Sequence, residues 1–131
     1  NNSQDIFQLK NNSDNIEAKL DTNGSWHVDG DVIAYSTSIS SDKKLKTNIS
    51  TLTDALDKTT KLRGVNFDWI DENKPNNQVG FIAQEVEEVL PQVVHTAPDG
   101  MKSVAYGNIV GILIEAIKEQ QKEIEELKKK L

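Results

Sequence analysis

The sequence predicts an α+β protein in which a short segment of strands is followed by a mixed α/β domain that ends in one long helix. Three observations predict it. Apolar residues alternate within residues 1–40, helix and strand patterns are mixed from Ser41 onward, and a seven-residue repeat runs from Val110 to Leu131. We therefore divide the 131 residues into a β-rich segment, 1–40, and a second domain, 41–131, whose residues 104–131 form a long helix or coiled coil.

Composition excludes several classes of function. The net charge of -6 argues against an extended face that binds phosphates, so we expect no nucleic acid partner. There are no cysteines, and the two histidines, His27 and His95, lie too far apart in the sequence to give a metal-ligand spacing, so we expect no metal and no cofactor. No apolar run reaches the roughly 18 residues of a membrane span, and the chain begins without a basic and then apolar leader. We expect no membrane partner and a sequence that is a piece of a longer protein.

The first forty residues read as consecutive short strands. The turn pairs Asn23-Gly24 and Asp29-Gly30 separate runs in which every second residue is apolar. These alternating residues are Ile16, Ala18, Leu20, Trp26, Val28, Val32 and Ala34. They are too few to enclose a core. We therefore expect copies of this segment, or chain upstream of it, to stabilise it.

Helix and strand patterns are mixed between residues 51 and 106. Thr51 and Asp54 resemble a capping box and predict a helix near 51–62. Residues 65–69 alternate as a strand, with a loop or hairpin leading to Val79, and a second strand pair is predicted at 92–97 and 102–106. Between them, Ile82, Val86, Val89 and Leu90 share one helical face that ends at Pro91. The glutamates of this helix, Glu85, Glu87 and Glu88, are expected to form a solvated face.

The C-terminal residues show the clearest periodicity. The a positions are Val110, Ile117, Ile124 and Leu131, and the d positions are Leu113, Gln120 and Leu127. Such a seam needs another helix against it, which predicts self-association. The alternative is an amphipathic helix that packs on its own domain. The β-branched a positions favour a dimer in parallel coils, but the polar Gln120 layer weakens that indication.

The stretch TSISSDKKLKTNIS, residues 37–50, has two readings. A neutral lysine can take the proton of a serine hydroxyl and make it a nucleophile, which would pair Ser41 with Lys46. The neighbouring cations Lys43 and Lys44 would favour the neutral form. The alternative reading is a solvated polar loop without chemistry.

Four blocks add a family resemblance to these patterns. SSDKKLKTNI, LRGVNFDW, VGFIAQEVEEVLPQVV and VAYGNIVGILIEAIKEQQKEIEEL occur in this order and cover nearly all of residues 40–131. They resemble the C-terminal intramolecular chaperone domain of phage tailspikes, tail fibres and neck appendages, the peptidase S74 family. Residues 1–40 are similar to the trimeric β-rich stalk that precedes this domain, and a neck appendage is the expected type.

The resemblance implies a homotrimer that assembles the stalk of the same polypeptide and then cuts itself. The family's serine, aspartate and lysine fall on Ser41, Asp42 and Lys46. Ser41 would attack the carbonyl of Ser40 and cleave the Ser40-Ser41 bond, Lys46 would be the general base, and Asp42 would hold the turn. We hypothesise that Ser41 and Lys46 meet only in the assembled trimer. The stalk would stay in the virion and the chaperone fragment would be released in the host cytoplasm.

Two other classes of function stay open. One is a trimerisation or adhesin tip module without catalysis, in which Ser41 and Lys46 are structural. The other is a self-processing regulator like the membrane-tethered eukaryotic transcription factors that carry a similar domain. Contact with the host surface is expected only through upstream sequence, and the sequence carries no phosphate-loop signature that would predict a nucleotide site.

Overall fold

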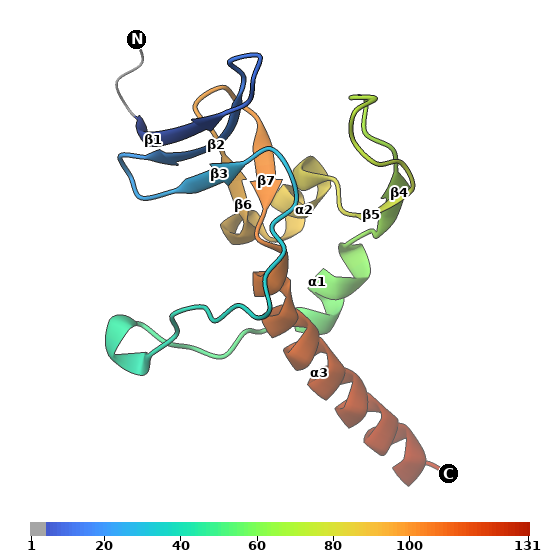
Figure 1. Cartoon of the computed structure of the whole chain (residues 1–131). Coiled ribbons are helices and arrows are strands. Elements are labelled where there is room, and N and C mark those ends of the chain that lie inside the picture. Colours follow the sequence, from blue (N-terminus) through green and yellow to red (C-terminus); the bar gives the residue numbers. More distant parts are fainter. Residues whose placement is uncertain (1–4) are drawn as a thin grey trace. The chain divides into compact units, whose positions relative to one another are not determined.

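The computed structural model describes residues 5–131, so the first four residues of the predicted β-rich segment lie outside the described residues. The chain divides into two compact units, Asn1–Thr47 and Asn48–Leu131. The mixture of short strands, short helices and one long C-terminal helix confirms the predicted α+β composition (Figure 1).

The first unit contains an antiparallel sheet of three strands in the order β1-β2-β3. The strands are β1 (Asp5–Lys10), β2 (Ile16–Asp21) and β3 (Trp26–Val28). Phe7, Leu20 and Trp26 stand opposite one another across the sheet, and the rings of Phe7 and Trp26 stack with centroids 6.5 Å apart. Among the described residues of this unit only Ala18 is a buried apolar side chain. The sheet thus has an apolar face but no enclosed core.

The strand predictions in this unit are partly right. The runs from Ile16 and from Trp26 form β2 and β3, and Gly24 makes the predicted turn between them with φ of +82°. The strand expected around Val32 and Ala34 is wrong, because residues 31–42 contain no strand. Val32 is 72 % exposed and has no neighbouring strand to pair with. The alternation also did not single out β1, whose charged and apolar residues are mixed.

The second unit is built from two hairpins and three helices. The helices are α1 (Ala55–Lys61), α2 (Ala83–Val89) and α3 (Ile109–Lys129). The hairpins pair β4 (Val65–Phe67) with β5 (Gln78–Gly80), and β6 (Val94–Thr96) with β7 (Lys102–Val104). Short 3₁₀ turns, η2 (Pro91–Val93) and η3 (Tyr106–Asn108), follow α2 and precede α3. The strand pair predicted at 92–97 and 102–106 is confirmed, and of the loop and the hairpin left open after residues 65–69 the structure shows the hairpin. Trp69 lies beyond the end of β4.

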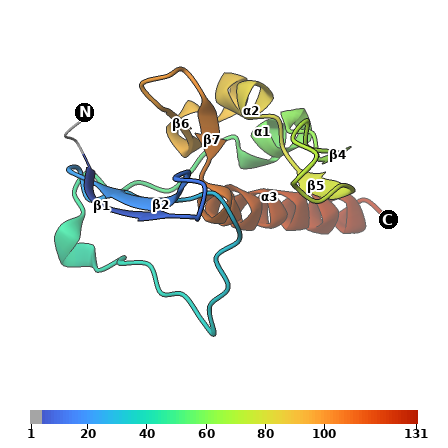
Figure 2. The ribbon, with the colours of Figure 1, turned by 45° about the horizontal axis from the view of Figure 1, so that its top comes forward.

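The core of this unit lies where α1 and α2 meet the first half of α3, and Figure 2 shows α1 alongside α3. Val86 and Leu90 are buried, as the helical pattern of α2 predicts, whereas Ile82 precedes the helix and is 38 % exposed. The buried set is Ala55, Val86, Leu90, Ile109, Ile112 and Ala116. This small core packs α1 and α2 on α3, and Val94 and Val104 of the β6-β7 hairpin lie against it.

The predicted capping box at the start of α1 is wrong. The helix begins at Ala55 rather than near Thr51, and Asp54 adopts a left-handed conformation with φ of 55° and makes no side-chain cap. The carboxylate of Glu119 instead accepts hydrogen bonds from the backbone N–H groups of Ala55 and Leu56, at 3.0 and 2.9 Å. A cap supplied from 64 residues further along the chain leaves no local sequence signal.

Candidate functional site

The segment from Ser41 to Lys46 folds into a single turn of 3₁₀ helix, η1 (Lys43–Leu45). Asp42 is its N-cap, and its Oδ1 accepts a hydrogen bond from the backbone N–H of Lys44 at 2.8 Å. The backbone N–H of Leu45 bonds to the Asp42 carbonyl, and that of Lys46 bonds to the Lys43 carbonyl, both at 3.1 Å. The aspartate cap and these two bonds turn the chain back on itself within six residues.

This turn brings Ser41 and Lys46 together. Lys46 Nζ donates a hydrogen bond to Ser41 Oγ at 2.6 Å. We hypothesised that the two side chains meet only in an assembled trimer. That hypothesis is wrong, because the local turn of one chain is enough to bring them into hydrogen-bond contact. Their role as nucleophile and general base stays a prediction.

Both side chains of the pair are exposed, as are all residues from 37 to 54. An ammonium group that donates to a hydroxyl cannot at the same time accept its proton. A lysine acts as a general base only when it is neutral, and removal from water is a main cause of neutrality. The single chain thus holds the candidate nucleophile and the candidate base within hydrogen-bond distance, both exposed to water.

The Ser40-Ser41 bond, predicted to be the cleavage site, lies in a stretch without helix or strand that precedes η1. Its carbonyl belongs to the residue directly before the candidate nucleophile. No helix or strand has to unfold for the Ser41 hydroxyl to reach this bond. The covalent proximity of hydroxyl and carbonyl supplies much of the orientation that an intermolecular attack would have to find.

The predicted coiled-coil seam lies on α3 from Val110 to Leu127, away from the core of its own unit, and Leu131 follows the end of the helix. Inward contacts come from Ile109, Ile112, Ala116 and Glu119. The seam residues Val110, Leu113, Ile117, Gln120, Ile124, Leu127 and Leu131 are exposed, and Ile117 is 63 % exposed. From Gln120 to Leu131 every residue is exposed. One helix thus carries an internal face, as the alternative reading expected, and a separate exposed apolar stripe; self-association through that stripe stays a prediction.

The helix itself is shorter than the predicted range of 104–131. It begins at Ile109 because residues 102–104 form β7 and residues 106–108 form η3. Tyr106, in η3, makes a contact that the sequence did not predict. Its hydroxyl accepts a hydrogen bond from the backbone N–H of Phe81 at 2.9 Å. A Cβ at position 80 would overlap this hydroxyl, so the close approach uses a glycine. The adjacent residues Gly80 and Phe81 were the sequence feature that could have indicated this contact.

The three glutamates of α2 lie at the surface, as expected, and two of them make ion pairs there. Glu85 makes a two-pronged ion pair with Arg63, whose Nε lies 3.1 Å from Glu85 Oε2, and this pairing holds the pKa of Glu85 below its ordinary value. Glu87 accepts a hydrogen bond from Lys102 Nζ at 2.9 Å. Glu88 is exposed. These carboxylates connect α2 to the chain before β4 and to β7, and form no catalytic pair.

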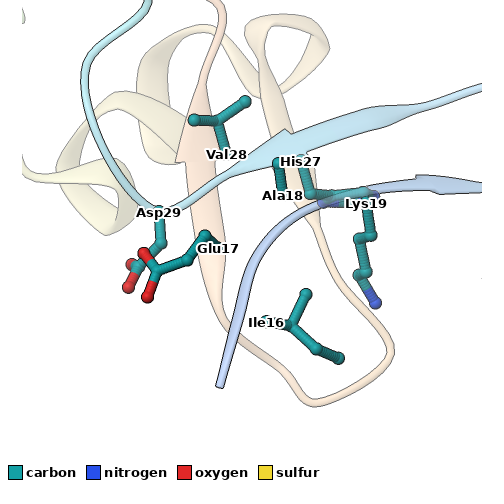
Figure 3. Close-up of a pocket in the computed structure, with 7 residues that line it drawn as sticks. All are labelled: Ile16, Glu17, Ala18, Lys19, His27, Val28 and Asp29. Atoms are coloured by element: carbon teal, nitrogen blue, oxygen red, sulfur yellow. The ribbon is translucent and has the colours of Figure 1, made fainter. Parts of the chain in front are cut away.

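A hollow of about 300 Å³ lies on β2 and β3, and it offers no serine or cysteine nucleophile (Figure 3). The residues that line it are Ile16, Glu17, Ala18, Lys19, His27, Val28 and Asp29.

Within residues 5–131 no cluster of three or more His, Asp or Glu could hold a metal ion. In the same range no helix is both long and apolar enough to cross a membrane.

Comparison with known proteins identifies relatives of this chain. It is 31% identical over 116 residues to the long tail fiber protein Gp37 of Enterobacteria phage K3, an alignment that covers 83% of this chain and 9% of that protein. It is 32% identical over 140 aligned positions to Gp37 of Salmonella phage S16, covering 99% of this chain and 18% of the relative. Gp37 of Enterobacteria phage M1 is 36% identical over 98 residues, 69% of this chain and 39% of the relative.

The chain thus spans a minor part of each of these relatives. All three are long tail fibre proteins, and the narrower expectation of a neck appendage stays a prediction. The family model Peptidase_S74, described as chaperone of endosialidase, matches residues 41–95 and so begins at Ser41. Residues 41–95 therefore belong to the Peptidase_S74 family, the chaperone of endosialidase family, as the motifs of the sequence predict.

Proposed function

We propose that this chain is the C-terminal part of a phage tail fibre subunit, in which residues 41–131 are an intramolecular chaperone that trimerises, guides the folding of the β-rich stalk, and is then released by its own cleavage of Ser40-Ser41. The contact that carries the proposal is the 2.6 Å hydrogen bond between Lys46 Nζ and Ser41 Oγ, directly after the bond to be cut. The relatives named as tail fibre proteins support a location in the virion.

The proposed reaction begins when neutral Lys46 takes the hydroxyl proton of Ser41. Ser41 Oγ forms a bond to the carbonyl carbon of Ser40, and the C–N bond between the two residues breaks as the amine leaves with the proton from Lys46. Ser40 is then held as an ester on the side chain of Ser41. Water hydrolyses the ester, which restores the hydroxyl and leaves a carboxylate on Ser40 and a free amine on Ser41.

Self-association is proposed to run through the exposed seam of α3. The part of α3 from Gln120 onward has no buried residue, and an isolated helix of about twelve residues is marginal in water. Exposed Ile117, Ile124 and Leu127 would lose contact with water if copies paired along this stripe. Parallel helices would also raise the local concentration of the stalk segments, which makes their registration effectively intramolecular.

The stalk segment has a clear need for such help. Its sheet exposes Phe7, Leu9 and Trp26, and buries only Ala18 within the described residues. Strands that must pair between chains fold slowly and leave edges open to aggregation. Once the chaperone has been cut away, an unfolded stalk would have no template for reassembly, so the mature fibre would be kinetically stable.

Incubation of the purified chain tests the proposal. Cleavage at Ser40-Ser41 would give fragments of 40 and 91 residues on a denaturing gel, and the larger would begin at Ser41 by mass spectrometry. Ser41→Ala and Lys46→Ala should stay intact, while the control Lys44→Ala, in the same turn but outside the pair, should still be cut. An intact wild-type chain under conditions where sedimentation shows a trimer would exclude self-cleavage.

The second candidate is a trimerisation or tip module without catalysis. The exposure of Lys46, and its position as a donor to Ser41, favour it. In that case Ser41→Ala and wild type would give the same intact band and the same trimer.

A further inference from the structure

The candidate dyad is open to dissolved molecules as well as to its own chain. Lys46 Nζ donates to Ser41 Oγ at 2.6 Å, and both partners belong to the compact unit Asn1–Thr47. Asp42 and the backbone bonds of η1 hold the two residues together. Every residue from 37 to 54 is exposed. A small acyl compound in solution can therefore reach the Ser41 hydroxyl.

The leaving group of the acyl compound decides how much the pair has to do. When an amide is cut, the base must take the hydroxyl proton and then protonate the departing amine. An aryl ester needs only the first of these transfers, because its phenolate leaves as a stable anion. An exposed lysine amine carries its proton at neutral pH and loses it in alkaline solution. Activated esters in alkaline solution are therefore the substrates that suit an exposed serine and lysine pair.

Neighbouring serines separate the effect of the lysine from the effect of exposure. Ser38, Ser40 and Ser50 lie in the same exposed stretch as Ser41. Within the described chain none of these three hydroxyls is hydrogen-bonded to a lysine, whereas Ser41 Oγ accepts from Lys46. A serine hydroxyl without a base is a weak nucleophile in water. Reaction confined to Ser41 would thus report the base and not the access of the reagent.

We propose that Ser41 and Lys46 form an acyl-transfer site for small activated esters supplied from solution. Neutral Lys46 takes the hydroxyl proton and becomes an ammonium, Ser41 Oγ bonds to the acyl carbon, and the bond from that carbon to the aryl oxygen breaks as the phenolate leaves. The acyl group stays on Oγ as an ester until water hydrolyses it to a carboxylate and restores the hydroxyl. This activity uses the same two side chains as the proposed self-cleavage, but it requires neither a cut at Ser40-Ser41 nor a second copy of the chain.

Incubation of the full chain with 4-nitrophenyl acetate between pH 7 and pH 10 tests the proposal, with the acetylated residue located by peptide mass spectrometry. Acetyl on Ser41 is an ester that hydroxylamine removes, whereas acetyl on a lysine amine is a stable amide. At pH 9 the labelling of Ser41 should be about a hundredfold faster than in Lys46→Ala, the lower end of the range for general base catalysis. Lys46→Arg keeps the positive charge but offers no base, so it should be as slow as Lys46→Ala.

Lys44→Ala is the matched control, because it changes another lysine of the same turn, and it should react as wild type does. The remaining charged groups of the turn, Asp42 and Lys43, stay unchanged in all variants. Equal labelling of Ser40 and Ser41 would overturn the inference, since exposure alone would then explain the reaction. Fast labelling in Lys46→Arg would overturn it too, and so would acetyl found on Lys46 Nζ in place of Ser41 Oγ.

Chains incubated without the ester show whether the Ser40-Ser41 bond is cut, so the two proposals fail separately. Fragments of 40 and 91 residues without acetylation of Ser41 would overturn acyl transfer and leave self-cleavage. Acetylation of Ser41 in a chain that stays intact would support acyl transfer and count against self-cleavage.

Discussion

The carboxylate of Glu119 accepts a hydrogen bond from the backbone N–H of Leu56 at 2.9 Å, and thereby ties the first turn of α1 to α3. Its second oxygen bonds to Ala55 N–H, so one side chain satisfies two of the donors that a helix start leaves open. Asp54 does not cap this helix itself. Glu119 therefore acts as the N-cap of a helix to which it does not belong.

Replacing Glu119 by alanine should lower the free energy of unfolding by about 1–2 kcal/mol, the usual range for loss of a cap. Chemical denaturation of the Ser41→Ala chain, which cannot be cut, measures it. Glu123→Ala, one turn further along α3 and exposed, is the matched control and should change stability little. Equal effects of the two substitutions would contradict a specific cap.

The contact between Gly80 and Tyr106 predicts a coupled pair of substitutions. Gly80→Ala should destabilise the chain by about 1–3 kcal/mol, because its Cβ overlaps the Tyr106 hydroxyl. In a Tyr106→Phe background the same change should cost less, since the hydroxyl is gone. The four chains of this cycle are compared by thermal unfolding. Gly64→Ala, where nothing lies within 4 Å, is the control, and additive effects would exclude the coupling.

The two faces of α3 predict two kinds of variant. Ile112 is 2 % exposed, so Ile112→Ala should cost about 2–5 kcal/mol of folding stability. Ile117→Ser with Ile124→Ser should leave the fold of the second unit intact and reduce assembly, because both side chains lie on the exposed stripe. Sedimentation of uncleavable chains against the 14.6 kDa monomer mass distinguishes the outcomes. A seam variant that assembles like its parent would argue for another interface.

Low pH should weaken the ion pair between Arg63 and Glu85. Hydrogen bonding to Arg63 lowers the pKa of Glu85, so the folded chain holds this proton less tightly than the unfolded chain does. The resulting stabilisation is fully present above the ordinary glutamate pKa of about 4.3 and disappears as the pH falls through the lowered pKa. Glu85→Gln should therefore lose less stability than its parent between about pH 5 and pH 2. Thermal unfolding of both chains over this range measures the loss. An equal loss of stability in the two chains would contradict the prediction.

The cap of η1 predicts a graded effect on cleavage. Asp42→Ala removes the acceptor for Lys44 N–H and should slow cleavage about fivefold, which corresponds to a cap of about 1 kcal/mol. Asp42→Asn keeps a side-chain oxygen and should cut at a rate close to wild type. The appearance of the 91-residue fragment with time measures both. Complete loss of cleavage in the asparagine variant would mean that the charge of Asp42 has a role beyond the turn.

Much of the local structure follows from residues that are neighbours in the chain. Alternation predicted β2 and β3, the apolar face of α2 predicted its buried Val86 and Leu90, and the strand pair predicted at 92–97 and 102–106 forms the last hairpin. The motif also singled out Ser41 and Lys46, which lie five residues apart and meet through one capped turn. In each case the decisive contacts lie within one turn, one hairpin or one helical repeat, where sequence spacing translates directly into distance.

The tertiary structure determined those contacts that residue spacing in the sequence does not indicate. Val32 alternates like a strand residue but has no partner strand, and Thr51 resembles a cap whose place is taken by Glu119 from α3. The α3 pattern contained two overlapping stripes, and only packing against α1 separated the buried Ile112 from the exposed Ile117. Backbone donors, apolar faces and strand edges take whichever partner the fold brings near, so residues distant in sequence determined the outcome at these positions.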